Sequence, residues 1–158
     1  MKNYPKYIKN TLFSVIYDMA KHPEDFCCCP EKNFTRKRKL PFEKVLTLLV
    51  KMGGHSLRDE MLDCLDFEDV PASVSALVQQ RSKILPKALE YLFREFTDRC
   101  QKPKLYKGYR LLAVDGSDLQ FTANPNDPLS YFPGVNGQKL YSFLHLNALY
   151  DLNSNLYL

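Results

Sequence analysis

The sequence predicts an α+β protein, in which an all-helical domain over residues 1–105 is followed by the first strands of a sheet over residues 106–158. Three observations lead to this prediction. Apolar residues recur at helical spacing up to about residue 100, and a basic segment containing Pro103 and Gly108 follows. Beyond that segment the apolar residues run continuously or alternate, as they do in strands. We expect these successive strands to form a β-meander.

Five helices are expected in the first domain. The first covers residues 5–21, and a connection over residues 22–35 follows it. The second covers residues 41–52, where Pro41 suits the first turn and Gly53-Gly54 stops the helix. Each has one apolar stripe, formed by Ile8, Leu12, Val15, Ile16 and Met19 in the first and by Phe42, Val45, Leu46, Leu49 and Met52 in the second.

The remaining three helices follow at short intervals. Ser56 begins the third helix, over about residues 57–66, with Asp59 at the position of a capping-box acid. The fourth helix covers about residues 73–84, and the fifth begins at Pro86. Their apolar positions include Leu57, Met61, Leu62 and Leu65, then Val74, Leu77, Val78 and Leu85, then Leu89, Leu92, Phe93 and Phe96.

The second part of the chain has the pattern of strands. Leu111 to Val114 is a continuous apolar run, which predicts a buried strand. Residues 122–140 are rich in proline, glycine and asparagine and predict a long loop. Residues 141–150 predict a second strand, residues 151–155 a hairpin turn, and residues 156–158 the start of a third strand.

Two or three strands rarely form a stable unit without further support. A sheet that stopped at Leu158 would keep an open edge and an unfinished core. We therefore expect this chain to be a fragment of a longer protein.

Composition narrows the class of protein. The net charge of +4 is mildly basic and favours an anionic partner without establishing one. No apolar run approaches the roughly 18 residues that span a bilayer, and the N-terminus lacks the pattern of a secretory signal, which predicts a cytoplasmic protein with no membrane contact. The five cysteines include three in a row and no paired C-x-x-C spacing, which favours reduced thiols over a zinc site.

Asp115 is the candidate catalytic and metal-binding residue. It follows the apolar run directly and precedes Gly116, and a buried strand would hold its carboxylate in a fixed direction. Carboxylate oxygens are the ligands that Mg²⁺ prefers. Gly116 would let the chain turn away and let a substrate approach closely. The alternative interpretation is that Asp115 caps a turn that Gly116 makes possible.

A basic run over residues 32–40 is the first candidate DNA-binding segment. Clustered cations neutralise phosphates and give an affinity that depends on salt but not on base sequence. The alternative is a solvated basic surface with no ligand. The residues assigned to DNA contact here are Arg36, Lys37, Arg38 and Lys39.

The helices expected over residues 57–66 and 73–84 form the second candidate. A helix, a connection and a second helix resemble a helix-turn-helix arrangement, although the connection is longer than the usual three or four residues. The residues assigned to DNA contact on the second helix are Gln80, Arg81 and Lys83. The first helix is acidic, and the alternative is an ordinary helical bundle with a polar outer face.

His145 and Asn147 share one face of the strand over residues 141–150 because strand side chains alternate. If this strand pairs with the Asp115 strand, His145 is placed near that carboxylate. The alternative is a histidine that is simply hydrogen-bonded on the surface of the sheet.

Four stretches, taken in order, resemble one known family. They are FTRKRKLPFEKVLTLLVKMGGHSLRDEM, VSALVQQRSKILPKALEYLF, YKGYRLLAVDGSDLQF and FLHLNALYDLNSNLYL. Together they are similar to the N-terminal portion of bacterial insertion-sequence transposases with a DDE triad, of the insertion-sequence-four type. The resemblance runs from about residue 34 to the end of the sequence.

This resemblance implies a ribonuclease-H-like catalytic domain that is truncated here, and it implies DNA, at the ends of a mobile element, as the partner. Self-association is a further candidate. In the full-length family three acids hold two Mg²⁺ or Mn²⁺ ions, which clamp the attacking and leaving oxygens. Asp115 matches the first acid of the triad. The later acids are Asp118, Asp127 and Asp151, and none matches the motifs of the second aspartate or the glutamate.

The sequence therefore predicts the N-terminal fragment of a DDE transposase that does not cut DNA alone and does not hold the metal ions stably. The alternatives are a non-catalytic helical module that binds DNA, and a degenerate relic without function.

Overall fold

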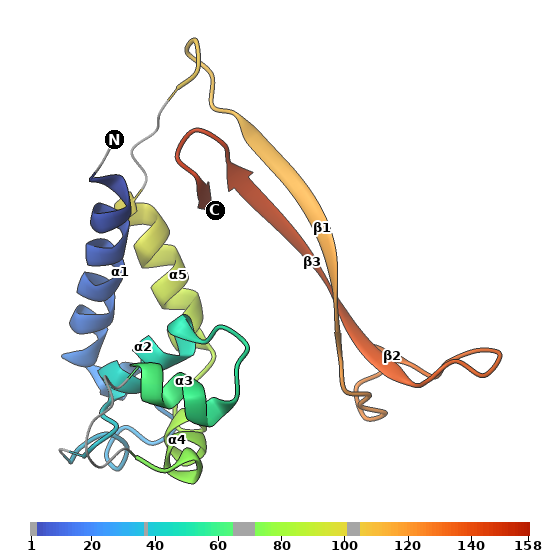
Figure 1. The fold of residues 1–158 in the computed structure, drawn as a ribbon, viewed down its shortest axis with the longest axis horizontal. Coiled ribbons are helices and arrows are strands. Elements are labelled where there is room, and N and C mark those ends of the chain that lie inside the picture. The colour runs from blue at the N-terminus through green and yellow to red at the C-terminus, as the bar shows by residue number, and fades with distance from the viewer. Residues whose placement is uncertain (1–2, 37, 65–71, 101–104) are drawn as a thin grey trace. The chain divides into compact units, whose positions relative to one another are not determined.

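The computed structural model describes residues 3–36, 38–64, 72–100 and 105–158. Within these ranges five α-helices and one short 3₁₀ helix precede a four-stranded antiparallel sheet (Figure 1). The α+β prediction is therefore confirmed at the level of class and element order. Contacts divide the chain into a helical unit, Met1–Cys100, and a sheet unit, Gln101–Leu158. The sequence placed this boundary at residue 105, and residues 101–104 of the basic segment expected there lie outside the described residues.

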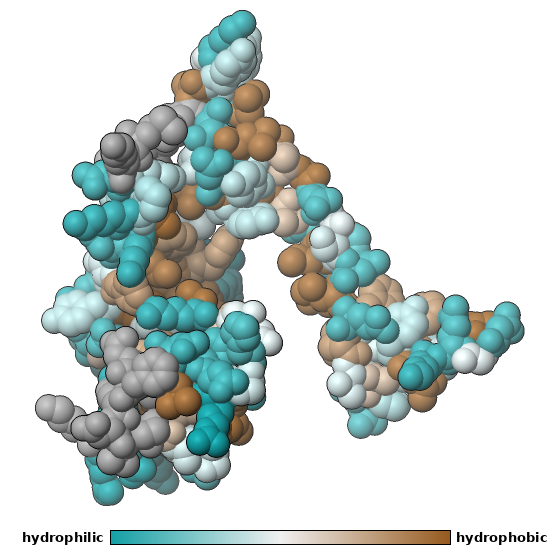
Figure 2. All heavy atoms as spheres, in the orientation of Figure 1, coloured by the Kyte–Doolittle hydropathy of each residue, from teal (hydrophilic) through white to brown (hydrophobic). Residues whose placement is uncertain are grey.

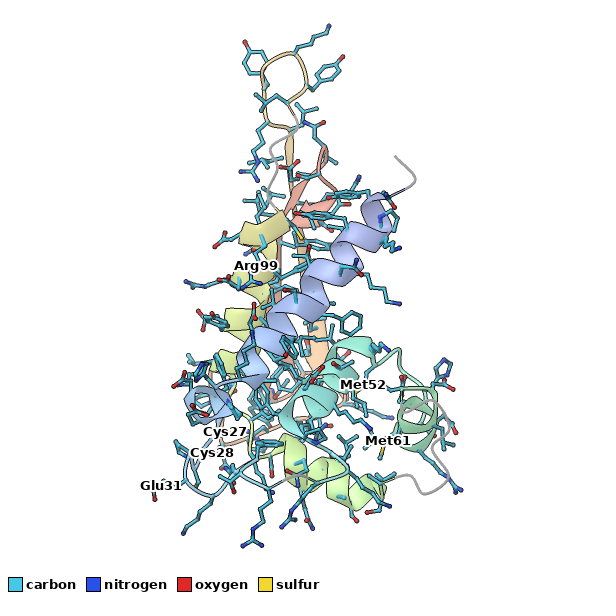
Figure 3. The ribbon with its side chains drawn as sticks, turned by 90° about the vertical axis from the view of Figure 1, so that its left-hand side faces the viewer. Cys27, Cys28, Glu31, Met52, Met61 and Arg99 are labelled. Atoms are coloured by element: carbon cyan, nitrogen blue, oxygen red, sulfur yellow. The ribbon has the colours of Figure 1, made fainter. Side chains whose placement is uncertain are left out.

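The first and last helices of the helical unit pack against each other. They are α1 (Tyr4–Ala20) and α5 (Lys87–Cys100), which agree with the predicted ranges. Arg99, labelled in Figure 3, joins them, because its Nη1 donates to Asp18 Oδ2 at 2.9 Å. Three residues of the apolar stripe of α1, Val15, Ile16 and Met19, are buried as its spacing predicts, and Leu12 packs against them. The core that they join also contains Phe26, Cys27, Phe42, Leu46, Ala88 and Leu92.

Helices α2 (Phe42–Lys51) and α3 (Leu57–Cys64) enclose a second core with α4 (Val74–Arg81). Met61 lies in that core, and Met52 packs against it (Figure 3). Pro41 is the N-cap of α2 rather than part of its first turn. At the start of α3 the Asp59 backbone N–H donates to Ser56 Oγ at 3.3 Å, as in a capping box.

Glu60 closes the connection between α2 and α3, a role that the sequence did not reveal. Its Oε1 accepts hydrogen bonds from the backbone N–H groups of Gly53 at 2.8 Å and His55 at 2.9 Å. The two N–H donors stabilise the charged carboxylate and lower its pKa, whereas burial raises it. Because the hydrogen bonds have the larger effect, the pKa of the Glu60 carboxyl is lowered. The double-glycine turn is thus held by a carboxylate from the following helix.

The fourth helix is shorter than predicted. The 3₁₀ helix η1 (Pro23–Phe26) lies within the expected connection, and α4 (Val74–Arg81) ends three residues before residue 84. Ser73 caps α4, because its Oγ accepts from the Ala76 backbone N–H at 3.2 Å. At its end the Ile84 N–H donates to the Arg81 carbonyl at 3.0 Å, which turns the chain.

The sheet is arranged around one long strand, β3 (Tyr141–Asp151). It pairs along most of its length with β1 (Leu112–Phe121), and it pairs near its two ends with β2 (Tyr131–Phe132) and β4 (Leu156–Tyr157) (Figure 1). The order β1, β3, β4 is that of the predicted meander. β2 is an addition, since it lies inside the loop predicted over residues 122–140.

The prediction that Asp115 follows a buried strand is wrong. β1 continues through Asp115 and Gly116 without a turn, and nine of its ten residues are exposed. Figure 2 shows apolar side chains at the surface along the β1–β3 ladder. A continuous apolar run is typical of a buried strand, but burial depends on what packs against the sheet, which the run itself does not specify.

No helix among the described residues is long and apolar enough to span a membrane.

Candidate nucleic-acid interface

A basic pocket in the helical unit brings two distant segments together. It is a cavity of about 230 Å³ between the loop that precedes α2 and the C-terminal end of α4. We use the name basic pocket for the cavity lined by Glu31, Lys32, Phe34, Thr35, Arg36, Arg38, Leu40, Gln80 and Lys83.

Backbone hydrogen bonds hold the two walls of the basic pocket side by side. The Cys28 N–H donates to the Lys83 carbonyl at 2.9 Å, and the Leu85 N–H donates to the Phe26 carbonyl at 2.9 Å. Phe34 anchors the loop, because its ring meets the ring of Phe42 edge-on at a centroid distance of 5.5 Å. The pocket is thus formed by backbone pairing and core packing, which place its cations without any ligand.

Four of the predicted DNA-contact residues line this pocket, namely Arg36, Arg38, Gln80 and Lys83. The placement of Lys83 on a helix is wrong, since it lies two residues beyond the end of α4. Gln80 is buried, and its Oε1 accepts a hydrogen bond from Lys83 Nζ at 3.2 Å. In this arrangement the Gln80 amide positions the lysine ammonium.

The other three predicted contacts are distributed differently. Lys39 lines a neighbouring cavity of about 410 Å³, which shares Arg38, Leu40 and Gln80 with the basic pocket. Arg81 is exposed and lines neither cavity. Lys37 lies outside the described residues. The helix-turn-helix comparison also rested on the connection at roughly residues 67–72, of which residues 67–71 lie outside them too.

The charge of the basic pocket suits an anion. Four of its lining residues are cationic, and Glu31 is the only acid among the nine. Arg36 and Arg38 are exposed and form no ion pair in the described part of the chain. Exposed guanidinium groups without a carboxylate partner can bind phosphate oxygens in a bidentate manner.

Three polar lining residues, Glu31, Lys32 and Thr35, were not predicted as contacts. Thr35 Oγ1 lies 3.4 Å from the Lys32 carbonyl, and the Lys32 N–H in turn donates to the Cys29 carbonyl at 3.0 Å. Lys32 belongs to the basic run that the sequence identified, so its charge was a usable signal. Nothing in the sequence pattern marked Thr35.

No second carboxylate adjoins Asp115 on its face of the β1–β3 ladder. It pairs in register with Ala148, and the flanking residues on that face of its strand are Ala113 and Ser117. Asp118 is three residues along and therefore points to the opposite face. No group of three or more histidine, cysteine, aspartate or glutamate residues in the described ranges could hold a metal ion. These residues therefore do not fit a two-metal site.

His145 does pair across β1 and β3, but with Asp118 and not with Asp115. Its Nδ1 lies 2.7 Å from Asp118 Oδ1. The expectation that pairing of the strands would place it near Asp115 is wrong, because the register puts His145 opposite Asp118 and on the other face of the sheet. The Asp118 carboxylate raises the pKa of His145. Gly116 lies beside the imidazole, at a position where a Cβ would be 3.1 Å from His145 Cε1.

The two remaining acids of the sheet unit organise turns. Asp151 is fully buried and accepts hydrogen bonds from Arg110 Nε at 2.7 Å and from the Asn153 N–H at 2.9 Å. The guanidinium group lowers the pKa of Asp151 far below its ordinary value. Asp127 accepts from the Ser130 hydroxyl at 2.7 Å. Both carboxylates are already satisfied within the chain, so neither is available to complete a site around Asp115.

Comparison of the chain with protein-family models, with curated proteins and with solved structures finds no match.

Proposed function

We propose that the helical unit binds DNA through the basic pocket, and that the chain is the N-terminal portion of an insertion-sequence transposase of the DDE class. The observation that carries the DNA-binding proposal is the convergence of Arg36, Arg38 and Lys83, from segments more than 40 residues apart, on one cavity. The assignment to the transposase class rests on the four sequence stretches that resemble that family.

The pocket's contacts are of the kind that recognise the phosphate backbone. Arginine and lysine side chains bind phosphate oxygens, and such contacts position a protein on DNA without reading base sequence. Lys83 is held by Gln80 at 3.2 Å, so less side-chain freedom is lost when it binds an anion. We expect salt-dependent affinity for duplex DNA with little dependence on base sequence from this pocket alone.

A fluorescence anisotropy titration of the full chain with a labelled DNA duplex tests this proposal. The Arg36→Ala/Arg38→Ala variant should bind more weakly at each salt concentration. The slope of log K against log[salt] should fall by about 0.9 for each phosphate contact that is lost. Adding Lys83→Ala to this double variant should lower the slope again, by about the same amount for the contact that Lys83 makes.

Lys6→Ala/Lys9→Ala is the matched control, because it removes the same charge from the exposed surface of α1, away from the pocket. Equal losses of affinity in the two double variants would mean that net charge, rather than the pocket, attracts DNA. Undiminished binding by the arginine variant would overturn the proposal.

For the sheet unit we propose that β1, β3 and β4 are the opening strands of a ribonuclease-H-like sheet, with Asp115 as the first acid of the triad. The antiparallel order of these strands supports the assignment at the level of topology. The two metal ions of that family, Mg²⁺ or Mn²⁺, would require two further carboxylates beside Asp115. We therefore propose that this chain does not cut DNA or hold those ions by itself.

An assay for strand cleavage in Mg²⁺ or Mn²⁺ tests the catalytic part separately from DNA binding. The chain alone should leave labelled DNA intact. If a complementing C-terminal portion restores cleavage, Asp115→Asn should abolish it without changing DNA affinity, whereas Asp118→Asn should not. Cleavage by the chain alone would contradict this proposal and leave the DNA-binding proposal standing.

A further inference from the structure

Two exposed cysteines are hydrogen-bonded through their backbones to residues that line the basic pocket. Of the three adjacent cysteines, Cys28 and Cys29 are exposed, whereas Cys27 is buried in the first core. Burial raises the pKa of the Cys27 thiol to about 11, which keeps it protonated and unreactive. The two outer thiols are therefore the accessible members of the triplet.

Hydrogen bonds join these two cysteines to both walls of the basic pocket. Cys28 contacts the wall from α4, since its N–H donates to the Lys83 carbonyl at 2.9 Å and its Sγ lies 3.7 Å from the Ser82 carbonyl oxygen. Cys29 contacts the other wall, since its carbonyl accepts from the N–H groups of Lys32 at 3.0 Å and Asn33 at 2.9 Å. Figure 3 shows Cys28 and Glu31 at the same end of the helical unit.

The neighbouring charges favour one class of reagent. Lys32 and Lys83 line the pocket together with Arg36 and Arg38. A positive cavity raises the local concentration of anions and speeds their association. Cysteines in exposed, electropositive surroundings are also the ones that react in thiol–disulfide exchange.

We propose that the Cys28–Cys29 thiol pair is a modification site for anionic low-molecular-weight disulfides, which the basic pocket attracts. One thiol loses its proton to solvent, and the thiolate attacks one sulfur of the disulfide R–S–S–R. A new protein–S–S–R bond forms, the S–S bond of the reagent breaks, and RS⁻ leaves and takes up a proton. The disulfide itself is the oxidant, so no other reactant is needed. This site is independent of whether the pocket binds DNA.

The test compares three disulfides of different charge on the full, reduced chain: anionic glutathione disulfide, neutral hydroxyethyl disulfide and cationic cystamine. Mass spectrometry of the intact protein gives the rates, and peptide mapping gives the modified cysteine. We expect modification at Cys28 or Cys29. The ratio of the glutathione disulfide rate to the cystamine rate should be about tenfold higher at low salt than at high salt, where screening removes the attraction.

Two sets of variants locate the effect. Cys28→Ser/Cys29→Ser should abolish the rapid reaction, whereas Cys64→Ser should keep it. Arg36→Ala/Arg38→Ala should lower the glutathione-to-cystamine ratio to the high-salt value, and Lys6→Ala/Lys9→Ala should not. Circular dichroism checks the fold of each variant, and the salt dependence of the unaltered chain decides the question if the arginine variant does not fold. A ratio insensitive to salt, or rapid modification mapped elsewhere, would overturn the proposal.

Discussion

His145 and Asp118 form a cross-strand pair, with Nδ1 and Oδ1 2.7 Å apart, on the face of the sheet opposite to Asp115. Gly116 lies two residues before Asp118 on β1, and its lack of a Cβ leaves room for the imidazole. The pair is solvent-exposed, with 55 % and 68 % of the respective side chains accessible. It therefore acts as a local contact between β1 and β3 and not as part of a buried site.

Asp118→Asn should lower the pKa of His145, because the Asp118 carboxylate is the main cause of its elevation above 6.5. Any stability from this pair is fully present below pH 6.5 and is lost as the pH rises through the raised folded-state pKa. NMR titration of the imidazole measures the shift, with His145→Gln to assign the signal. Asp115→Asn is the control, since it removes a carboxylate from the other face. An equal shift in both variants would contradict the pairing.

Gly116→Ala should disturb the His145–Asp118 pair, since the added Cβ would lie 3.1 Å from His145 Cε1. In a His145→Ala background the same change should stabilise the sheet unit by about 0.5–1 kcal/mol, because alanine loses less backbone entropy than glycine in a strand. A double-mutant cycle in urea measures the coupling. Equal effects in the two backgrounds would show that the imidazole does not constrain this position.

Glu60→Gln should weaken the helical unit at neutral pH and reduce its sensitivity to acid. The Gly53 and His55 N–H groups favour the charged carboxylate and lower its pKa from 4.5, so its contribution is present above that pH and is lost as the pH falls through the folded-state pKa. Urea unfolding between pH 3 and pH 7 measures this. Glu43→Gln, an exposed change on α2, is the control. Parallel pH profiles for Glu60→Gln and the unaltered chain would sink the prediction.

Leu46→Ala should destabilise the helical unit by about 2–5 kcal/mol, because it opens a cavity at a fully buried position in the first core. Val50→Ala, on the same helix but 40 % exposed, should change stability by only about 0.5 kcal/mol. The two free energies of unfolding, measured in urea, should therefore differ clearly. Similar values would mean that α2 does not pack as described.

The helices were predictable because their signals are local. The stripe from Ile8 to Met19 and the double glycine after Met52 define α1 and α2 closely. Glu60 shows the limit of such signals. Its side chain caps a turn that precedes it by several residues, and no periodic pattern distinguishes it from the other acids of α3.

The candidate site was less predictable because it depends on which segments meet. The basic run indicated Arg36 and Arg38, but the backbone pairing of Cys28 with Lys83 and of Phe26 with Leu85 brings the end of α4 to them. In the sheet, the odd spacing of Asp115 and Asp118 predicts that their side chains lie on opposite faces of β1. It does not predict the register with β3, and that register determines which of the two carboxylates lies next to His145.

The pairing of α1 with α5 has a consequence for synthesis. Tyr7 near the start of α1 donates its hydroxyl to the Arg99 carbonyl at 2.8 Å, so the first helix of the helical unit closes on the last helix of that unit, which is synthesised later. Until α5 emerges, the apolar stripe containing Val15 and Ile16 lacks that cover. During this interval α1 is exposed to chaperones and to other nascent chains, because unburied apolar surface is what both recognise.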